Sequence, residues 1–317
     1  MNSKSIFKKF KWLILLAVAI SAVYGMGRLY YNITDGFTIG NITSDFAYDP
    51  RWEVTPLRPE EKVLVGSILD QKFSYLGKGC QSYVFLSQDG KYVLKFFKYQ
   101  RFRTKPWVDF FSFIPSIDRY RLKKLEKKRL KLEGFIESWK IAYNELKHES
   151  GLLFVHLNKT NHLNKTLNFT DKMGMAHQVN LDEMEFMIQH KATMLDSTIK
   201  KLMAENKVEE AKSLLKTLIE LITSENHRGL ADNDHALMQN TGVYDGRPIH
   251  VDVGQFLYND QIRNPATYKQ ELFNKTYRFH RWLEKHYPEL ADYLTTELVA
   301  IIGNDFYKLE PYFKPHD

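Results

Sequence analysis

FSYLGKGCQSYVFLSQDGKYVLK, residues 73–95, is the stretch that decides the fold of this chain. Two runs with alternating apolar residues flank a Gly-Lys-Gly turn at 77–79, and a third apolar run ends at Lys95. Alternation on both sides of a glycine turn predicts a β-hairpin whose tip carries little side-chain bulk. Such a tip lets backbone N–H groups come close to a polyphosphate, while a strand lysine supplies positive charge. The residues that would form this cradle are Gly77, Gly79, Ser82, Val84 and Lys95.

A second stretch far along the chain, residues 227–256, reads HRGLADNDHALMQNTGVYDGRPIHVDVGQF. The Asp245-Gly246 pair between two β-prone runs is a strong hairpin signal. Asn240 and Asp252 would then stand side by side at the outer ends of adjacent antiparallel strands. Their side chains carry the oxygen ligands that Mg²⁺ prefers. This stretch therefore predicts a magnesium site.

The combination of these two stretches resembles the protein-kinase-like superfamily, over roughly residues 67–256. The resemblance implies that Lys95 pairs with the nucleotide phosphates and that the glycine turn covers them. It also implies that Asn240 is the loop metal ligand and that Asp252, in Asp-Val-Gly, is the main metal-binding aspartate. The implied cofactors are ATP and Mg²⁺.

The catalytic aspartate is the point where this sequence departs from the family pattern. The family places it five residues before the asparagine, and His235 occupies that position here. Asp234 requires a loop one residue longer and is the first choice, and Asp232 is the second, because a general base must reach the acceptor hydroxyl. The triplet at 227–229 is either an echo of the family's His-Arg-Asp start or an unrelated helix end.

Residues 117–146 show the apolar spacing of a long helix. In the kinase-like interpretation this helix supplies a glutamate that pairs with Lys95. Glu137 is the first choice, with Glu133 and Glu145 left open. The Lys and Arg side chains of the helix are expected to form a solvated face rather than a face that binds a membrane or an anion.

An uncharged run at 12–26 follows four lysines in the first eleven residues. It is shorter than the roughly 20 residues of a typical span, yet we favour a signal anchor over a cleaved signal peptide or a buried helix. The lysine excess places the N-terminus in the cytoplasm. Residues after the anchor would then lie across the membrane, where six Asn-x-Thr sequons would fit but ATP would have to be available. The side of the catalytic domain therefore stays open.

Composition sets further bounds. The apolar content of 44% supports a sizeable core, and the single cysteine, Cys80, excludes an intrachain disulfide. A net charge of +7 without aromatic–basic recognition modules gives no expectation of nucleic-acid binding. The predicted fold class is α+β, a two-lobed kinase-like fold with a small antiparallel-sheet N-lobe, a long helix and a mainly helical C-lobe behind a membrane segment. The expected parts are a basic tail (1–11), an anchor (12–26), a stalk or linker (27–60), an N-lobe (61–175) and a C-lobe (176–317). Within the C-lobe, helices are expected over 181–204, 208–225, 266–286 and 288–302.

The segment between Asp252 and the next predicted helix is short, and no Ala-Pro-Glu-like anchor follows it. Family members that phosphorylate proteins carry a longer platform there, so the resemblance implies a small-molecule, glycan or lipid hydroxyl as acceptor. The expected function is a membrane-anchored phosphotransferase that uses ATP. Two alternatives stay open: a pseudokinase that acts as a nucleotide-binding or scaffold module, and a basic membrane-surface protein that binds no nucleotide.

Overall fold

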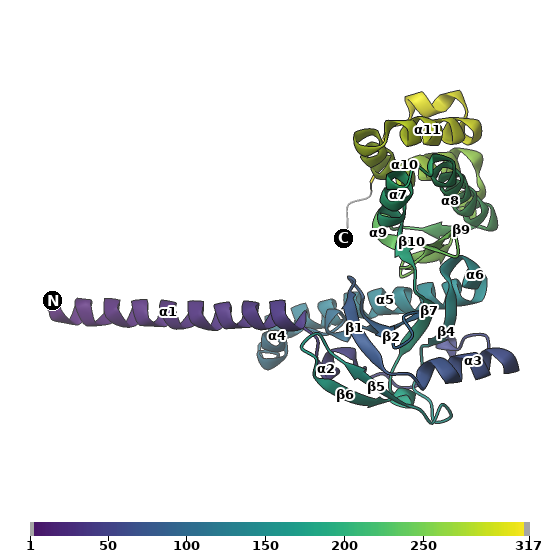
Figure 1. The fold of residues 1–317 in the computed structure, drawn as a ribbon. Helices are drawn as coiled ribbons and strands as arrows, with labels where there is room; N and C mark the ends of the chain where they lie inside the picture. The colour runs from purple at the N-terminus through teal and green to yellow at the C-terminus, as the bar shows by residue number, and fades with distance from the viewer. Residues whose placement is uncertain (1–2, 314–317) are drawn as a thin grey trace.

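A curled seven-stranded sheet, a mainly helical part and a long projecting helix make up this α+β chain (Figure 1). The computed structural model describes residues 3–313, and side chains are described for residues 10–313. The sheet has the strand order β4-β7-β3-β2-β1-β5-β6, in which only the β1–β5 pair is parallel. Its strands are β1 (Phe73–Lys78), β2 (Ser82–Ser87), β3 (Tyr92–Phe97), β4 (Leu152–His156), β5 (Thr166–Thr170), β6 (Ala176–Asn180) and β7 (Phe186–His190).

The predicted hairpin at 73–95 is confirmed, because β1, β2 and β3 form a continuous antiparallel meander. Side-chain alternation along β3 sends Leu94 and Phe96 into one core and Lys95 and Phe97 to the opposite face. That opposite face is covered by α5 (Pro115–Glu145), which the sequence predicted as a helix over 117–146. Lys95 is therefore directed into the layer between the sheet and the long helix.

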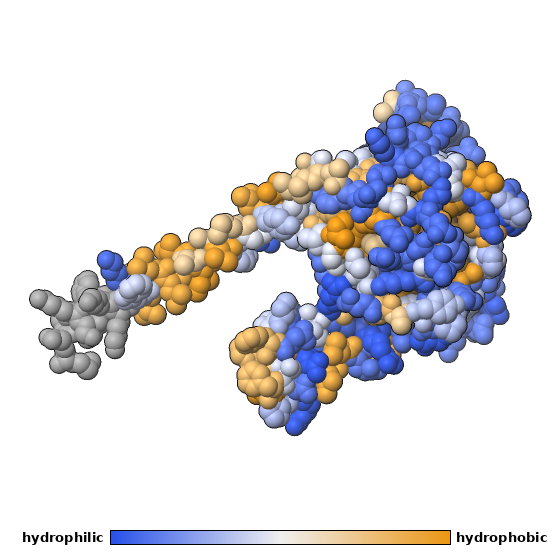
Figure 2. All heavy atoms as spheres, turned by 90° about the horizontal axis from the view of Figure 1, so that it is seen from below, coloured by the Kyte–Doolittle hydropathy of each residue, from blue (hydrophilic) through white to orange (hydrophobic). Residues whose placement is uncertain are grey.

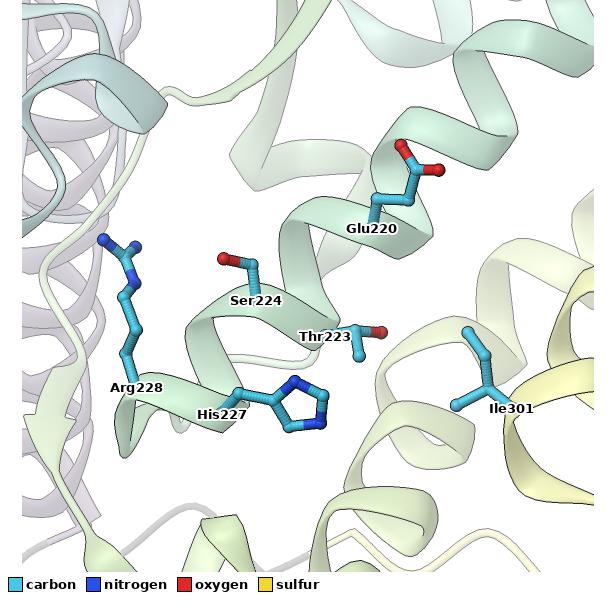
Figure 3. Close-up of a pocket in the computed structure, with 6 residues that line it drawn as sticks. All are labelled: Glu220, Thr223, Ser224, His227, Arg228 and Ile301. Atoms are coloured by element: carbon cyan, nitrogen blue, oxygen red, sulfur yellow. The ribbon is translucent and has the colours of Figure 1, made fainter.

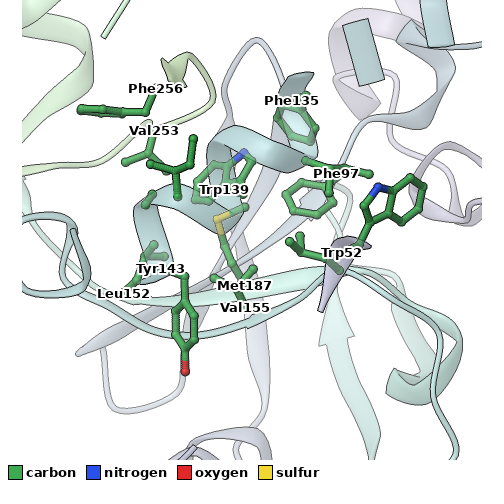
Figure 4. Packing of buried hydrophobic residues seen from close by; sticks show 14 of the residues in the cluster. Trp52, Phe97, Phe135, Trp139, Tyr143, Leu152, Val155, Met187, Val253 and Phe256 are labelled. Atoms are coloured by element: carbon green, nitrogen blue, oxygen red, sulfur yellow. The ribbon is translucent and has the colours of Figure 1, made fainter. Parts of the chain in front are cut away.

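The core on this face packs aromatic side chains of α5 against the sheet and continues into the helical part (Figure 4). Trp139 of α5 and Met187 of β7 belong to the same buried cluster as Val253 and Phe256, which lie in the second informative stretch. Burial of large aromatic and aliphatic side chains contributes about 1.5–3 kcal/mol each. This shared core holds the Asp-Val-Gly segment near the face of β3 that carries Lys95 and Phe97.

The predicted boundary between the two lobes at residues 175 and 176 does not match the sheet. Strands β6 and β7 lie beyond it and belong to the seven-stranded sheet, and β7 pairs with both β3 and β4. Residues 181–204 were expected to be one helix, but only their last part, Leu195–Ala204, is helical. The reason is that β7 is buried on both faces, so its apolar run has no alternation to separate it from helix.

The mainly helical part contains the remaining elements. Helices over 208–225, 266–286 and 288–302 were predicted and are present with small shifts at their ends. The helices are α7 (Leu195–Ala204), α8 (Val208–Arg228), α9 (Leu237–Asn240), α10 (Pro265–His286) and α11 (Pro288–Ile302). Two small sheets contain β8 (Thr193–Met194), β9 (Leu230–Asp232), β10 (Thr241–Tyr244), β11 (Arg247–His250) and β12 (Phe256–Tyr258).

The N-terminal helix α1 (Ser3–Thr34) projects from the body (Figure 1). The stretch from Phe10 to Thr34 is 25 residues long and contains an 18-residue window with a mean hydropathy of 1.8 and no buried residue, so it is long and apolar enough to cross a membrane. The apolar helix thus extends well past the predicted anchor at 12–26. The predicted basic tail at 1–11 falls mostly outside the described side chains.

The expected stalk at 27–60 is not an extended linker in this structure. Its first part completes α1, and its later part packs on the sheet, where Phe37 and Ile42 are buried on one face and Trp52 on the other. The composition of this segment, rich in Asn, Thr, Asp and Pro, concealed these single large apolar residues. Short helices α2 (Ile39–Ile42), α3 (Pro59–Leu69), α4 (Pro106–Phe110) and α6 (Lys147–Ser150) complete the chain.

A carboxylate just after α1 ties the projecting helix to strand β1 and to the turn between β5 and β6. Asp35 accepts hydrogen bonds or ion pairs from Tyr75 at 2.9 Å, Lys78 at 3.0 Å and Lys172 at 3.1 Å. Burial alone would raise the pKa of Asp35, but these three partners lower it to about 2. The backbone of Asp35 is left-handed, with φ of 55°, a conformation that Asp and Asn both tolerate.

We expect Asp35→Asn to lower the free energy of unfolding by about 1 kcal/mol at pH 7, because the amide keeps the turn but loses the charge. Since the folded-state pKa is depressed, this stabilisation is present above pH 4 and disappears as the pH falls through about 2. Urea unfolding at pH 7 and at acid pH checks this. The matched control is Asp245→Asn, at an exposed turn residue with φ of 49°. An equal loss in both variants would contradict the role of the Asp35 charge.

Candidate functional site

Lys95 lies at the centre of the candidate site. Its side chain is 7% exposed, and its ammonium donates a hydrogen bond to the carbonyl oxygen of Val251, the residue before Asp252. The indole ring of Trp139 lies beneath it, 6.0 Å from Nζ to the ring centroid. Burial lowers the pKa of Lys95 to about 8, and the charge of Asp252 partly opposes that shift. Segments more than 150 positions apart therefore meet at one buried ammonium group.

Asp252 lies beside this lysine, and two further carboxylates, those of Asp232 and Asp234, act on Asp252. Burial raises the pKa of Asp252, the charge of Lys95 lowers it, and the charges of Asp232 and Asp234 raise it again. One carboxylate oxygen of Asp252 accepts a hydrogen bond from the backbone N–H of Gly254 at 3.1 Å. The cluster thus holds more negative than positive charge around Asp252.

The two candidates for the general base differ in their surroundings. Asp232 is buried and forms an ion pair of 2.5 Å with Lys275 of α10, and both side chains are at most 5% exposed. Asp234 is half-buried, and its carboxylate accepts hydrogen bonds from the N–H of Ala236 at 2.9 Å and from the side chain of Gln255 at 3.4 Å. Asp234 is therefore the one whose carboxylate a solvent-borne acceptor can approach.

The predicted hairpin of the second stretch is present. Strands β10 and β11 pair from Thr241 opposite His250, and both Asp245 and Gly246 have positive φ at the turn. Beyond the last pair, the N–H of Val251 donates to the carbonyl of Asn240 at 2.8 Å. This hydrogen bond holds the backbone of Asn240 next to the Asp252 segment, as predicted for two residues at the ends of adjacent antiparallel strands.

The glycine turn lies over the Asp-Val-Gly segment. Within the turn the N–H of Gly79 donates to the carbonyl of Ser82 at 2.9 Å, and Val84 pairs with Lys95 across β2 and β3. A Cβ added at Gly77 would meet nothing within 4 Å, so open space adjoins the turn there. A Cβ added at Gly254 would lie 2.0 Å from Oε1 of Gln81, a buried oxygen without a hydrogen-bond partner.

Side chains outside the predicted cradle residues hold this turn in place. Nζ of Lys98 donates to the carbonyl of Gly79 at 2.5 Å, and Arg101 donates to the carbonyl of Cys80 at 2.8 Å. Burial lowers the pKa of Lys98 to about 8. Gln81 and Lys98 lie within or just after the pattern at 73–95, but only the folded arrangement brings their side chains onto the turn and Asp-Val-Gly. Lys275 could have been found as a lone basic residue on the apolar face of its helix.

Glu137 does not pair with Lys95 in this structure. It is exposed and lines a surface cavity with Arg51 and Glu133, on the side of α5 away from the sheet. The helix buries Ser138 and Trp139 toward the site instead, and Ser138 donates a hydrogen bond of 2.6 Å to the carbonyl of Val253. The two glutamates left open also have other partners: Glu133 lies 3.6 Å from Arg51, and Glu145 accepts from Tyr258.

The oxygen-bearing side chains around Asp252 decide whether this site can bind Mg²⁺. Among the described residues no group of three or more His, Cys, Asp or Glu side chains has the arrangement of a metal site. Mg²⁺ in nucleotide sites, however, takes only one or two carboxylates together with water and phosphate oxygens. Asp252 beside two further carboxylates, with Asn240 adjacent, provides such a set, so the residues fit a Mg²⁺–nucleotide complex.

A separate cavity of about 430 Å³ lies on the helical part, lined by Glu220, Thr223, Ser224, His227 and Arg228 of α8 and by Ile301 of α11 (Figure 3). His227 and Arg228 form the last turn of α8, which ends at Gly229 with φ of 80°. Arg228 already forms an ion pair of 2.9 Å with Glu149. The triplet at 227–229 is thus a helix end, and the cavity lies apart from the Lys95 cluster.

No protein-family model and no curated protein matches this chain. Solved structures of WbdD, titled a bifunctional kinase-methyltransferase in one case, are similar at 13% identity, with TM-scores of 0.34 and 0.35. The match covers 73% and 75% of this chain but only 44% and 45% of the WbdD chains. A similarity at this identity and TM-score does not identify the function of this chain.

Proposed function

We propose that this chain is a membrane-anchored, kinase-like phosphotransferase that moves the γ-phosphate of ATP to a hydroxyl of a small-molecule, sugar or lipid acceptor. The observation that carries the proposal is the buried ammonium of Lys95 against Val251, next to the carboxylate of Asp252. The seven-stranded sheet with a long helix on one face, together with a mainly helical part, supports the proposal, because the resemblance implies a sheet-rich part and a helical part.

Each residue of the cluster has a role in this proposal. Lys95 orients the phosphates of the nucleotide, with the glycine turn above them, and its positive charge stabilises charge that develops during transfer. Asp252 and Asn240 would hold Mg²⁺, and the bound ion would supply positive charge against the phosphates. Asp234 orients the acceptor hydroxyl and accepts its proton.

Asp232 has a structural role in this scheme. Its carboxylate is buried in the ion pair with Lys275, so it shapes the loop through the N–H of Asp234, which donates to it at 3.0 Å. Since phosphoryl transfer requires mainly positioning and charge stabilisation, a loop held in this way favours turnover.

A second candidate function is a pseudokinase that binds nucleotide or a partner without turnover. Two observations favour it. In the described part of the chain no glutamate forms an ion pair with Lys95, and the side chain of Gln81 reaches Gly254 in the space below the glycine turn. An active enzyme would have to move Gln81 aside when nucleotide binds.

Thermal shift and turnover assays on the full chain in detergent, with ATP in the presence and absence of Mg²⁺, test the proposal. Saturation at a hundred times Kd should stabilise the fold by about 2.7 kcal/mol. Magnesium-dependent binding with hydrolysis or transfer to sugars or lipids supports the phosphotransferase. Binding without turnover supports the pseudokinase. No binding at millimolar ATP contradicts both and favours the membrane-surface protein that binds no nucleotide.

A further inference from the structure

The connector between β3 and α5 forms an exposed apolar projection on helix α4. Trp107 is 52% exposed, Phe110 73% and Phe113 75%. The ring of Phe111 lies between those of Phe110 and Phe113, with centroid distances of 4.9 Å and 6.1 Å. Single exposed apolar residues are ordinary on protein surfaces, but a contiguous aromatic patch marks an interaction site. We call these four residues the aromatic tip.

Basic residues surround the aromatic tip. Residues 101–131 contain eleven basic and three acidic residues, so this segment carries +8 while the whole chain carries +7. Several of these cations lie near one another. Burial lowers the pKa of Lys128, and the charges of Lys124, Arg101 and Lys105 lower it further. The projection therefore combines apolar rings with a concentrated positive field.

The aromatic tip and α1 project from the same side of the body. Figure 1 shows α4 and α1 on the same side of the body, and Figure 2 shows a second, partly apolar projection that is separated from the apolar helix by a gap and extends toward the same side. The connector before α4 also contacts the segment after α1, because Arg103 donates to the carbonyls of Gly40 at 2.8 Å and Thr43 at 2.7 Å. A membrane around α1 would meet this side of the body.

We propose that the aromatic tip inserts into the interface of a bilayer that contains anionic lipid, with the surrounding lysines and arginines on the head groups. Trp and other aromatic rings favour this interface, and basic residues near it gain attraction from anionic lipid. A second copy of the same patch would bring +8 against +8, so charge selects the lipid surface as the occupant. With α1, this contact gives two points of attachment and fixes which side of the body faces the membrane. The proposal is independent of nucleotide binding.

A fluorophore at the tip tests this contact in the full chain. In a Cys80→Ser background, which removes the single cysteine, Phe110→Cys is labelled with a polarity-sensitive dye. The matched control is Val63→Cys on α3, because Val63 is 74% exposed and α3 lies at the far end of the body from α4 (Figure 1). Both proteins are placed singly in lipid nanodiscs of phosphatidylcholine alone or with phosphatidylglycerol, each with nitroxide-labelled lipid as a quencher.

We expect strong quenching at position 110 and little at position 63, with more quenching in the discs that contain phosphatidylglycerol. The double variant Lys105→Glu/Lys124→Glu should weaken partition of the tip more than tenfold in those discs, at roughly fivefold for each charge near the surface. Equal, weak quenching at both positions would overturn the proposal. So would a dye at position 110 that is shielded only as protein concentration rises in detergent, since that result assigns the tip to contacts between copies.

Discussion

Lys95→Met is expected to reduce the affinity for MgATP by about thirtyfold or more while the chain stays folded. Loss of a buried, charge-assisted hydrogen-bonding partner costs about 2–5 kcal/mol of binding. The fold should tolerate the change, because Lys95 is held at a depressed pKa by burial and methionine fills a similar volume. One carbonyl, that of Val251, loses its donor, at a cost of about 1–3 kcal/mol.

Calorimetric titration of nucleotide together with thermal unfolding of the same samples measures both effects. Lys200→Met is the matched control, since Lys200 is exposed, forms an ion pair of 2.7 Å with Asp196 and lies 5.8 Å from the ring centroid of Trp282, away from the Lys95 cluster. Such a pair contributes about 0.3–0.5 kcal/mol, so this variant should keep its affinity and its melting temperature. If Lys95→Met binds MgATP as tightly as the unchanged chain, Lys95 does not touch the phosphates and the nucleotide site lies elsewhere.

The parts of the fold that the sequence predicted are those with strong periodicity or turn chemistry. The β1–β2–β3 meander, the hairpin at Asp245-Gly246 and helices α5, α8, α10 and α11 were all found from local patterns. Strand β7 was missed because it is buried on both faces, where apolar residues follow one another without alternation. The segment after α1 was missed because a few anchoring residues, such as Phe37 and Trp52, decide its packing.

The candidate site divides in a similar way. Lys95 and Asp252 were predicted to lie together, and they do, because strand alternation and hairpin register fix where each backbone runs. Glu137 was chosen from three glutamates on one helix, and a choice among them depends on helix rotation. The rotation is set by the burial of Phe135 and Trp139 against the sheet, which no spacing rule resolves at one-residue accuracy. Gln81 and Lys275 act through contacts that only the folded chain creates.

The rotation of α5 bears on function as well as on prediction. Ser138 and Trp139 occupy the side of the helix that faces Lys95 and Asp-Val-Gly. The ammonium is thus held by a backbone carbonyl and an aromatic face rather than by a carboxylate. A nucleotide that offers phosphate oxygens would meet a lysine with no competing anion from the helix, while the charge of Asp252 remains the balancing group.

The paired variants Asp232→Asn and Asp234→Asn should separate structure from chemistry. Asp232→Asn leaves the buried ammonium of Lys275 without its hydrogen-bonded carboxylate, with only the more distant charges of Glu225 and Glu271, which costs up to about 3–5 kcal/mol of stability. The double variant Asp232→Asn/Lys275→Met should recover most of that loss, because it removes the uncompensated charge. Asp234→Asn should unfold like the unchanged chain, since an amide oxygen can still accept the hydrogen bond from Ala236.

The rate of phosphoryl transfer should rank the variants differently from their stability: Asp234→Asn should lose more activity than the folded variants of Asp232. Asp234→Asn should lower the rate of phosphoryl transfer by about 10²–10⁴, the usual contribution of a general base, while the affinity for MgATP is kept. The rescued double variant should keep most of its rate, because Asp232 acts only through the loop that it shapes. Urea unfolding and single-turnover transfer on the same samples decide between the two. A stable Asp232→Asn variant without activity, beside an active Asp234→Asn variant, would reverse the assignment and make the buried carboxylate the base.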